Sequence, residues 1–95
     1  MHIKRVIIQD DYSDKIWRKH QVDEDEMREV LLHRRTFFRK LEKGRVAGED
    51  LFGAYGQTEA GRYLSVFFIY KLTHDAFVIS ARDMDKKERK RYAKT

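Results

Sequence analysis

The residues best suited to chemistry stand near the end of the sequence, where one arginine precedes a strongly basic segment. Arg82 ends a long apolar run, and Lys86, Arg89 and Tyr92 follow it within one short stretch. Clustered cations attract phosphate groups, and basic side chains beside aromatic rings recur where proteins hold single-stranded nucleic acid. The pattern predicts anion binding at Arg82, with Tyr63 as an aromatic neighbour. The plainer interpretation is a solvated terminal helix whose charges serve solubility.

Three further residues carry side chains that could move protons. Lys19 and His20 follow one another at the end of an expected helix, and histidine is the side chain best suited to proton exchange near neutral pH. A histidine that binds the last carbonyls of its helix is the structural alternative. Glu88 is the only carboxylate within the basic segment from residue 86 onward. It either acts as a base or neutralises a cation one helical turn away.

The sequence offers no pattern for a metal or an organic cofactor. It contains no cysteine, and His2, His33 and His74 have no partner at ligand spacing. No phosphate-binding glycine loop, nucleophile elbow or paired-carboxylate motif is present. We therefore expect neither a metal site nor a cofactor.

The composition limits the broad class of the protein. The chain has 95 residues, 39% of them charged, and a formal net charge of +5. This length predicts a single small domain over residues 1–95. No apolar run approaches the roughly 20 residues of a membrane span, and the first residues lack a signal-peptide pattern. We expect a cytoplasmic protein that does not associate with a membrane.

The elements that must position these side chains follow from hydrophobic patterning and capping signals. Strands are expected over residues 3–9, 34–41 and 51–57, and a central hairpin over 61–82. Helices are expected over 14–20 with Ser13 as N-cap, from Asp23 to near His33, and over 83–95. Asp23 and Glu26 have the spacing of a capping box. The order β-α-α-β-β-β-β-α predicts an α+β fold, with a small antiparallel sheet, two helices in the N-terminal half and a basic C-terminal helix.

The register of the expected sheet decides which side chains share a face. A four-residue turn before the central hairpin would place Ala54 opposite Ser65, and a symmetric second turn would pair Ser65 with Arg82. Tyr55 would then lie under the two helices, and Arg62 would lie on the opposite face from Arg82. A slip of one residue would reverse such assignments. We also expect Ile16 and Trp17 to be buried from the first helix.

Three blocks in order, residues 17–22 (WRKHQV), 56–64 (GQTEAGRYL) and 78–82 (VISAR), carry a resemblance to a known family. They are similar to the BrnT-like toxins of bacterial type II toxin–antitoxin modules, which belong to the wider RelE-like ribonuclease fold. The match spans most of the chain from Trp17 onward. The sequence departs from these toxins at Gln21, where glycine is common after the histidine, and in a longer segment over residues 34–50.

The resemblance implies a metal-independent endoribonuclease that cleaves mRNA through attack of the substrate's own 2′-hydroxyl. A cognate antitoxin would hold it in check as a hetero-oligomer. Basic residues would stabilise the pentacoordinate transition state, with Arg82 as the main clamp. Matched to the family pattern, the catalytic residues would be Arg82, His20, Lys19 and Glu88. The RNA-binding residues would be Arg62, Tyr63, Lys86, Arg89 and Tyr92.

Two other functions fit the same residues. A basic module that binds RNA or an acidic protein without cleaving would use the same C-terminal helix, and the lack of an evident general base favours it. A structural partner of a neighbouring small protein is a third hypothesis.

Overall fold

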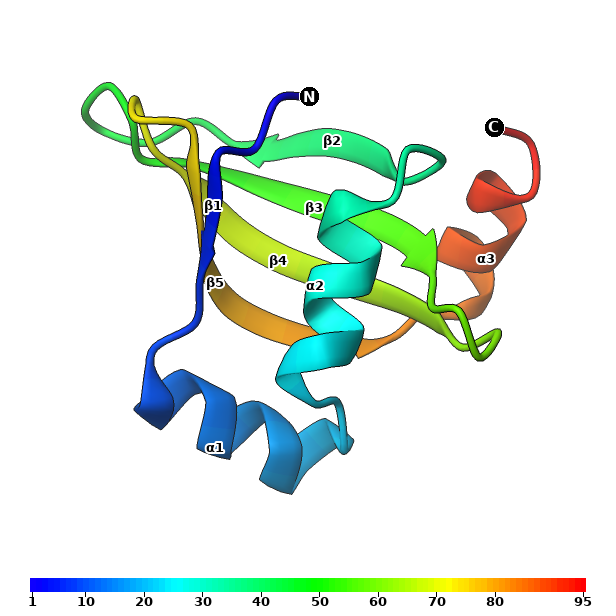
Figure 1. Cartoon of the computed structure of the whole chain (residues 1–95). Coiled ribbons are helices and arrows are strands. Elements are labelled where there is room, and N and C mark those ends of the chain that lie inside the picture. Colours follow the sequence, from blue (N-terminus) through cyan, green and yellow to red (C-terminus); the bar gives the residue numbers. More distant parts are fainter.

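The β-branched and aromatic run of the sequence forms the centre of a five-stranded sheet (Figure 1). The structure, a computed structural model, describes residues 1–95. Its elements are β1 (Arg5–Ile7), α1 (Asp10–His20), α2 (Glu24–Leu32), β2 (Phe37–Glu42), β3 (Asp50–Gln57), β4 (Tyr63–Tyr70), β5 (Asp75–Asp83) and α3 (Lys86–Tyr92). The predicted α+β class and element order are confirmed.

The sheet has the strand order β1-β5-β4-β3-β2. Strands β2 to β5 are antiparallel neighbours, as expected, but β1 runs parallel to β5 and makes the sheet mixed. The reason is the long connection through α1, α2 and three strands, which returns the chain to β1 in the same direction. An ion pair fixes this edge, because the Arg5 guanidinium donates to both carboxylate oxygens of Asp75 at 3.1 and 2.8 Å.

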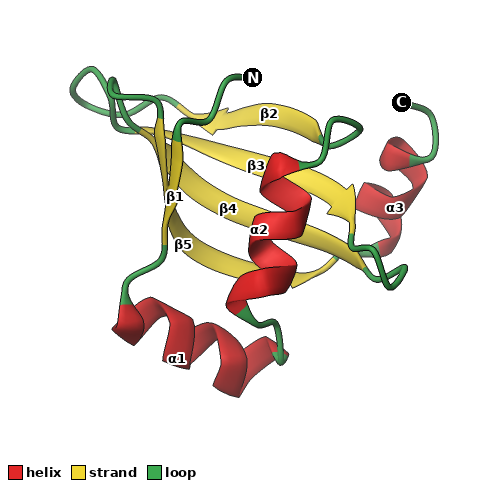
Figure 2. Cartoon of the chain, in the orientation of Figure 1, coloured by secondary structure: helices red, strands yellow, loops and turns green.

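Helices α1 and α2 cover one face of the sheet (Figure 2). Their buried side chains and those of the sheet form one core: Ile16, Val22, Met27, Val30, Leu31, Ala54, Leu64, Val66, Phe68, Ala76, Val78 and Ala81. The capping box predicted for α2 is present, since Asp23 accepts from the Glu26 N–H and Glu26 accepts from the Asp23 N–H. Burying each large apolar side chain stabilises the fold by about 1.5–3 kcal/mol.

Helix α1 differs from the expectation at its start and in its buried face. It begins at Asp10 with Gln9 as N-cap, so Ser13 lies inside it. Asp10 and Asp11 in the first turn interact favourably with the helix dipole and replace a side-chain cap. Ile16 is buried as predicted, but Trp17 is 54% exposed because the next residue on a helix points about 100° away from the core.

Helix α3 lies against the opposite face of the sheet. Successive side chains of a strand alternate between faces, so Tyr55, Ser65 and Phe67 point away from the core to which Ala54 and Val66 belong. Ser65 bonds to Glu88 of α3, which places the helix on that second face. A capping box of Asp85 and Glu88 starts α3. None of the residues of α3 is buried, so the helix has no core of its own and depends on its contacts with the rest of the fold.

One predicted register is wrong and the other is right. Tyr55, not Ala54, lies opposite Ser65, because the loop between β3 and β4 spans residues 58–62 and is one residue longer than the expected turn. Tyr55 therefore faces away from the two helices instead of lying under them. The predicted pairing of Ser65 with Arg82 is confirmed. An irregularity next to Phe67 then shifts the β4–β5 register.

None of the helices is both long enough and apolar enough to span a membrane.

Candidate functional site

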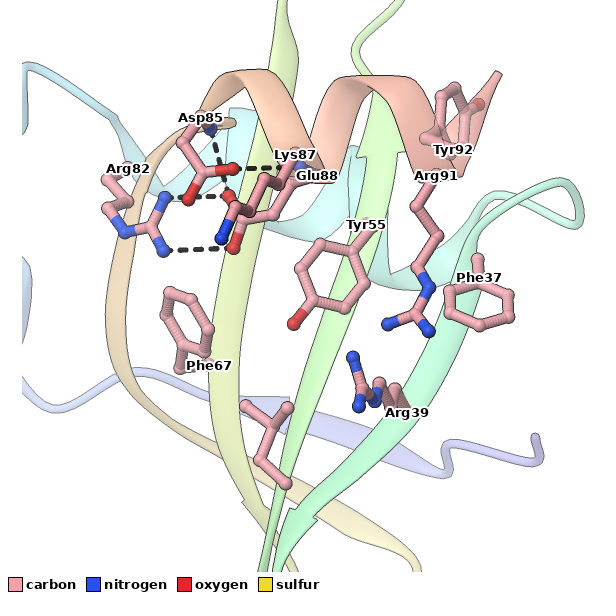
Figure 3. A pocket seen from close by; sticks show the side chains of 11 residues that line it. Phe37, Arg39, Tyr55, Phe67, Arg82, Asp85, Lys87, Glu88, Arg91 and Tyr92 are labelled. Atoms are coloured by element: carbon pink, nitrogen blue, oxygen red, sulfur yellow. Dashed lines mark hydrogen bonds and ion pairs between the residues drawn. The ribbon is translucent and has the colours of Figure 1, made fainter. Parts of the chain in front are cut away.

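A pocket of about 540 Å³ lies between α3 and the second face of the sheet (Figure 3). Its lining residues come from four strands and from the start and body of α3: Phe37, Arg39, Leu41, Tyr55, Phe67, Arg82, Asp85, Lys87, Glu88, Arg91 and Tyr92. Four of these side chains are cationic and two are anionic, so the pocket is electropositive. Pockets of about 300–1,000 Å³ commonly take small ligands.

Arg82 and Glu88 meet at one side of this pocket. Arg82 Nη1 lies 2.7 Å from Glu88 Oε1, and Nη2 lies 2.9 Å from Oε2. Two further donors fix the carboxylate, since the Ser65 hydroxyl and the Asp85 N–H each donate to Oε1 at 2.9 Å. The Arg82 guanidinium also lies 5.1 Å from the centre of the Phe67 ring. The guanidinium is therefore held in one orientation.

The charges of this pair are stable at neutral pH. Burial opposes ionisation of Glu88, but the hydrogen bonds from Arg82, the Asp85 N–H and Ser65 outweigh it and lower the pKa of the carboxyl. The hydrogen bond to Glu88 likewise raises the pKa of Arg82. A carboxylate with a lowered pKa is a weak proton acceptor, so Glu88 is better suited to orienting Arg82 than to general-base chemistry.

Tyr55 stands in the middle of the pocket, between the Arg82–Glu88 pair and the side chains of Arg39 and Arg91 (Figure 3). It is 7% exposed. Burial, and then the negative charge of Glu88, raise the pKa of the Tyr55 hydroxyl, while the three arginines oppose that rise. Three guanidinium groups thus act on one phenol.

Arg62 has a different position from Arg82. Its Nε and Nη2 donate to Asp83 at 2.8 and 3.3 Å, and its Nη1 donates to Glu26 at 3.2 Å. Its remaining donors bind the carbonyls of Gln21 and His20 at the end of α1, at 2.7 and 3.0 Å. A guanidinium has five N–H groups, and all of them are used here. Arg62 joins α1, α2 and β5, with no donor left for RNA, and it lies away from Arg82, as the register predicted.

Lys19 and His20 do not line the pocket of Arg82. They end α1, where the His20 carbonyl accepts from Arg62, on the face of the sheet that α1 covers. Gln21 has a left-handed backbone with φ of 52°, a conformation that glycine adopts without strain. Of the four predicted catalytic residues, the structure brings together Arg82 and Glu88 only.

Some of the predicted RNA-binding residues of β4 and α3 lie next to one another. The ring of Tyr63 lies edge-on to that of Tyr92, with centroids 6.0 Å apart, and the Arg89 guanidinium lies 4.1 Å from the centre of the Tyr63 ring. Tyr92 also lines the pocket, whereas Lys86 is exposed and does not. These side chains form an aromatic and cationic border beside the pocket.

Sequence reasoning missed Phe37, Arg39, Tyr55 and Arg91 as site residues. The alternation of Phe37, Arg39 and Leu41 was the available signal, because strand residues two apart share a face. Tyr55 was missed through the wrong β3–β4 register. No group of three or more His, Asp or Glu side chains in the structure could hold a metal ion.

Comparisons with known proteins identify the fold. No model of a protein family and no curated protein matches the sequence. Among solved structures, the chain is similar to the ribonuclease toxin BrnT of Brucella abortus, with a TM-score of 0.61 and 17% sequence identity. The match covers 86% of this chain and 97% of that chain. The chain therefore has a BrnT-like fold, as the sequence resemblance predicted.

Proposed function

We propose that the protein is a toxin-type endoribonuclease that cleaves mRNA in the cytoplasm and is held in check by a cognate antitoxin. The fold likeness to a ribonuclease toxin supports this class. The observation that carries the proposal is the Arg82 guanidinium, oriented by Glu88 in an electropositive pocket. Donors that are fixed before the substrate arrives stabilise developing charge without further reorganisation.

The donors of Arg82 suit contact with a phosphate. The guanidinium uses three of its five N–H groups, two on Glu88 and one on the Asp83 carbonyl. Its Nε–H and one Nη2–H remain for a ligand, in contrast to Arg62. Its side chain is 35% exposed, so a phosphate oxygen can reach these donors.

The reaction proposed is an in-line transesterification. The substrate's 2′-oxygen forms a bond to the adjacent phosphorus while the bond from phosphorus to the 5′-oxygen breaks, giving a 2′,3′-cyclic phosphate and a free 5′-hydroxyl. One proton leaves the 2′-hydroxyl and one is delivered to the 5′-oxygen. Arg82 would stabilise the extra negative charge of the pentacoordinate phosphorus. The predicted proton-transfer role of His20 and Lys19 would require the substrate to reach the end of α1.

A second candidate function is RNA binding without cleavage. The lowered pKa of Glu88 favours it, together with the raised pKa of Tyr55 and a pocket lining that contains no histidine. The pocket then offers neither a histidine nor a carboxylate of raised pKa at Glu88 to accept the proton of the 2′-hydroxyl. A structural role beside a small partner protein is the third candidate function.

The deciding experiment is RNA cleavage by the purified protein in the presence of a chelator, together with growth arrest on expression. Arg82→Ala is compared with Arg45→Ala, which removes an exposed cation outside the pocket. We expect cleavage and arrest in the wild type and in Arg45→Ala, and loss of both in a folded Arg82→Ala. RNA binding with steep salt dependence but no cleavage would select the second function. Undiminished toxicity of Arg82→Ala would refute the site.

The antitoxin is tested separately. Co-expression with the product of a directly adjacent small open reading frame, of about 80–100 residues as is usual for single-domain chains of this kind, should restore growth and yield a complex. Complex formation without any toxicity of the protein alone would favour the structural role.

A further inference from the structure

The pocket contains a second cationic group that the predicted catalytic residues do not include. Arg39 of β2 and Arg91 of α3 lie on the other side of Tyr55 from Arg82, and their guanidinium groups point toward one another (Figure 3). Both act on the Tyr55 hydroxyl by their charge, which places them within electrostatic reach of the same atom. Two separate elements of the fold thus direct like charges into one space.

No carboxylate compensates these two charges. The ion pairs of the structure join Arg5 to Asp75, Arg28 to Glu24, Lys40 to Asp50, Arg62 to Glu26 and Asp83, and Arg82 to Glu88. Arg39 and Arg91 take part in none of them, and both side chains are exposed. Like charges that face one another repel, and an anion bound between them is attracted to both and offsets that repulsion.

The surroundings specify what kind of anion fits. Planar guanidinium groups bind phosphate oxygens through paired N–H donors. The rings of Phe37 and Tyr55, with centroids 6.2 Å apart, lie beside the two arginines. Phe37 is half-buried and offers an apolar surface, whereas Tyr55 is 7% exposed. A phosphate beside aromatic rings is the pattern of a nucleotide in a single strand.

We propose that Arg39 and Arg91 form a second phosphate subsite, which takes the phosphodiester next to the one held at Arg82. The pocket then binds single-stranded RNA across two consecutive phosphates, with Tyr55 between them. The assignment of the first phosphate to Arg82 rests on the proposed function, whereas the second subsite rests on the two unpaired arginines. Contacts to phosphate set the position of the strand and carry no base sequence.

The test measures binding of short, uncleavable probes, so it is independent of catalysis. The probes are dinucleotides with a 2′-deoxy sugar at the junction, prepared without a terminal phosphate, with a 5′-phosphate and with a 3′-phosphate. In the wild type, one terminal phosphate should raise affinity about tenfold. In Arg39→Gln/Arg91→Gln this gain should disappear, while affinity for the probe without the terminal phosphate changes less than twofold.

The matched control is Arg45→Gln/Lys90→Gln, which removes the same charge from exposed positions outside the pocket. It should keep the tenfold gain. With a longer RNA, the slope of log affinity against log salt should fall by about 0.7 in the pocket variant, the loss of one phosphate contact to a single strand.

Three results would overturn the subsite: a gain that persists in Arg39→Gln/Arg91→Gln, an equal loss in the control variant, which would indicate diffuse charge, or no phosphate-dependent gain in the wild type. A gain that depends on Arg39 and Arg91 in a protein that cleaves no RNA would leave the subsite standing and refute the proposed nuclease. RNA cleavage by a protein that shows no phosphate-dependent gain would refute the subsite and leave the proposed nuclease standing.

Discussion

Glu88 binds Arg82 through two parallel hydrogen bonds of 2.7 and 2.9 Å, and this contact joins α3 to the end of β5. The same carboxylate receives the Asp85 N–H that starts α3 and the hydroxyl of Ser65 in β4. One side chain therefore caps a helix, docks it on the sheet and orients an arginine. Glu88 is a positioning residue for Arg82.

The first prediction concerns the geometry of Arg82. Arg82→Lys keeps the charge but loses the planar, two-pronged contact with Glu88, and a lysine ammonium binds phosphate as a point charge. We expect kcat/KM for RNA cleavage to fall by about 100-fold, the cost of one transition-state donor. The measurement is cleavage of a fluorogenic RNA under single-turnover conditions, with Arg45→Lys as the control. Full activity of Arg82→Lys would show that only charge matters at this position.

The second prediction concerns pH and Glu88. The folded pKa of this carboxyl lies below its ordinary value of 4.5, so its contribution to stability is complete above that pH and is lost as the pH falls through the folded pKa. The difference in unfolding free energy between the wild type and Glu88→Gln should be about 1.5–3 kcal/mol at pH 7, the usual contribution of a hydrogen bond to a charged group, and should shrink in acid. Urea unfolding from pH 7 to pH 3 measures it.

A difference that stays constant with pH would contradict the lowered pKa of Glu88. Asp75 and Asp83, whose pKa values are lowered by hydrogen bonds from Arg5 and Arg62 respectively, titrate in both proteins and cancel in the comparison.

The third prediction separates stability from binding at Arg62. Arg62→Ala leaves Glu26 and Asp83 without their partner and exposes the carbonyls at the end of α1. Because only 27% of the Arg62 side chain is exposed, its ion pairs are partly desolvated, and we expect the substitution to lower the unfolding free energy by about 2–3 kcal/mol. Arg35→Ala, at an exposed position without an ion pair, should change it by less than about 0.5 kcal/mol.

The RNA affinity of the folded fraction should be unchanged in Arg62→Ala. A fall in affinity without a fall in stability would instead support the RNA-binding role predicted for Arg62 from the sequence.

The fourth prediction concerns the glycine under Tyr55. A Cβ at position 53 would lie 2.5 Å from the Tyr55 hydroxyl oxygen and 2.8 Å from its Cζ, so the ring must move. Gly53→Ala should cost about 1–2 kcal/mol, as overpacking does, and weaken RNA binding by displacing the ring. In a Tyr55→Ala background the same substitution should cost less than about 0.5 kcal/mol. A double-mutant cycle in urea measures the coupling, and additive costs would contradict the contact.

The features that sequence could predict are local ones. The capping box of Asp23 and Glu26 depends on residues three apart, and the apolar stripe of α2 depends on helical spacing. The pairing of Ser65 with Arg82 was predicted by counting outward from a single tight turn. The strands next to that turn pair one residue away from the counted register, and the irregularity beside Phe67 restores it. Arg82 and Glu88 were both identified, because α3 follows β5 after a short connection.

The features that sequence could not predict depend on contacts between distant segments. The β3–β4 loop is one residue longer than expected, and that residue moves Tyr55 from the helix-covered face into the pocket. Arg39 and Arg91 stand far apart in the chain, and only the docking of α3 on the second face of the sheet brings them together. Arg62 resembles a binding residue in sequence, but its bonds to α1 and α2 become visible only in the fold.

The pocket exists only while helix α3 is attached to the sheet. The helix spans Lys86–Tyr92 without a buried residue, and isolated helices shorter than about 12 residues do not persist in water. It stays on the sheet through Glu88 and the contacts of Tyr63 with Arg89 and Tyr92. The amide protons of α3 should therefore exchange with solvent faster than those of β4, and ligand should slow them. The attachment of α3 and the binding of ligand in the pocket are therefore coupled equilibria, and amide hydrogen-exchange rates report both.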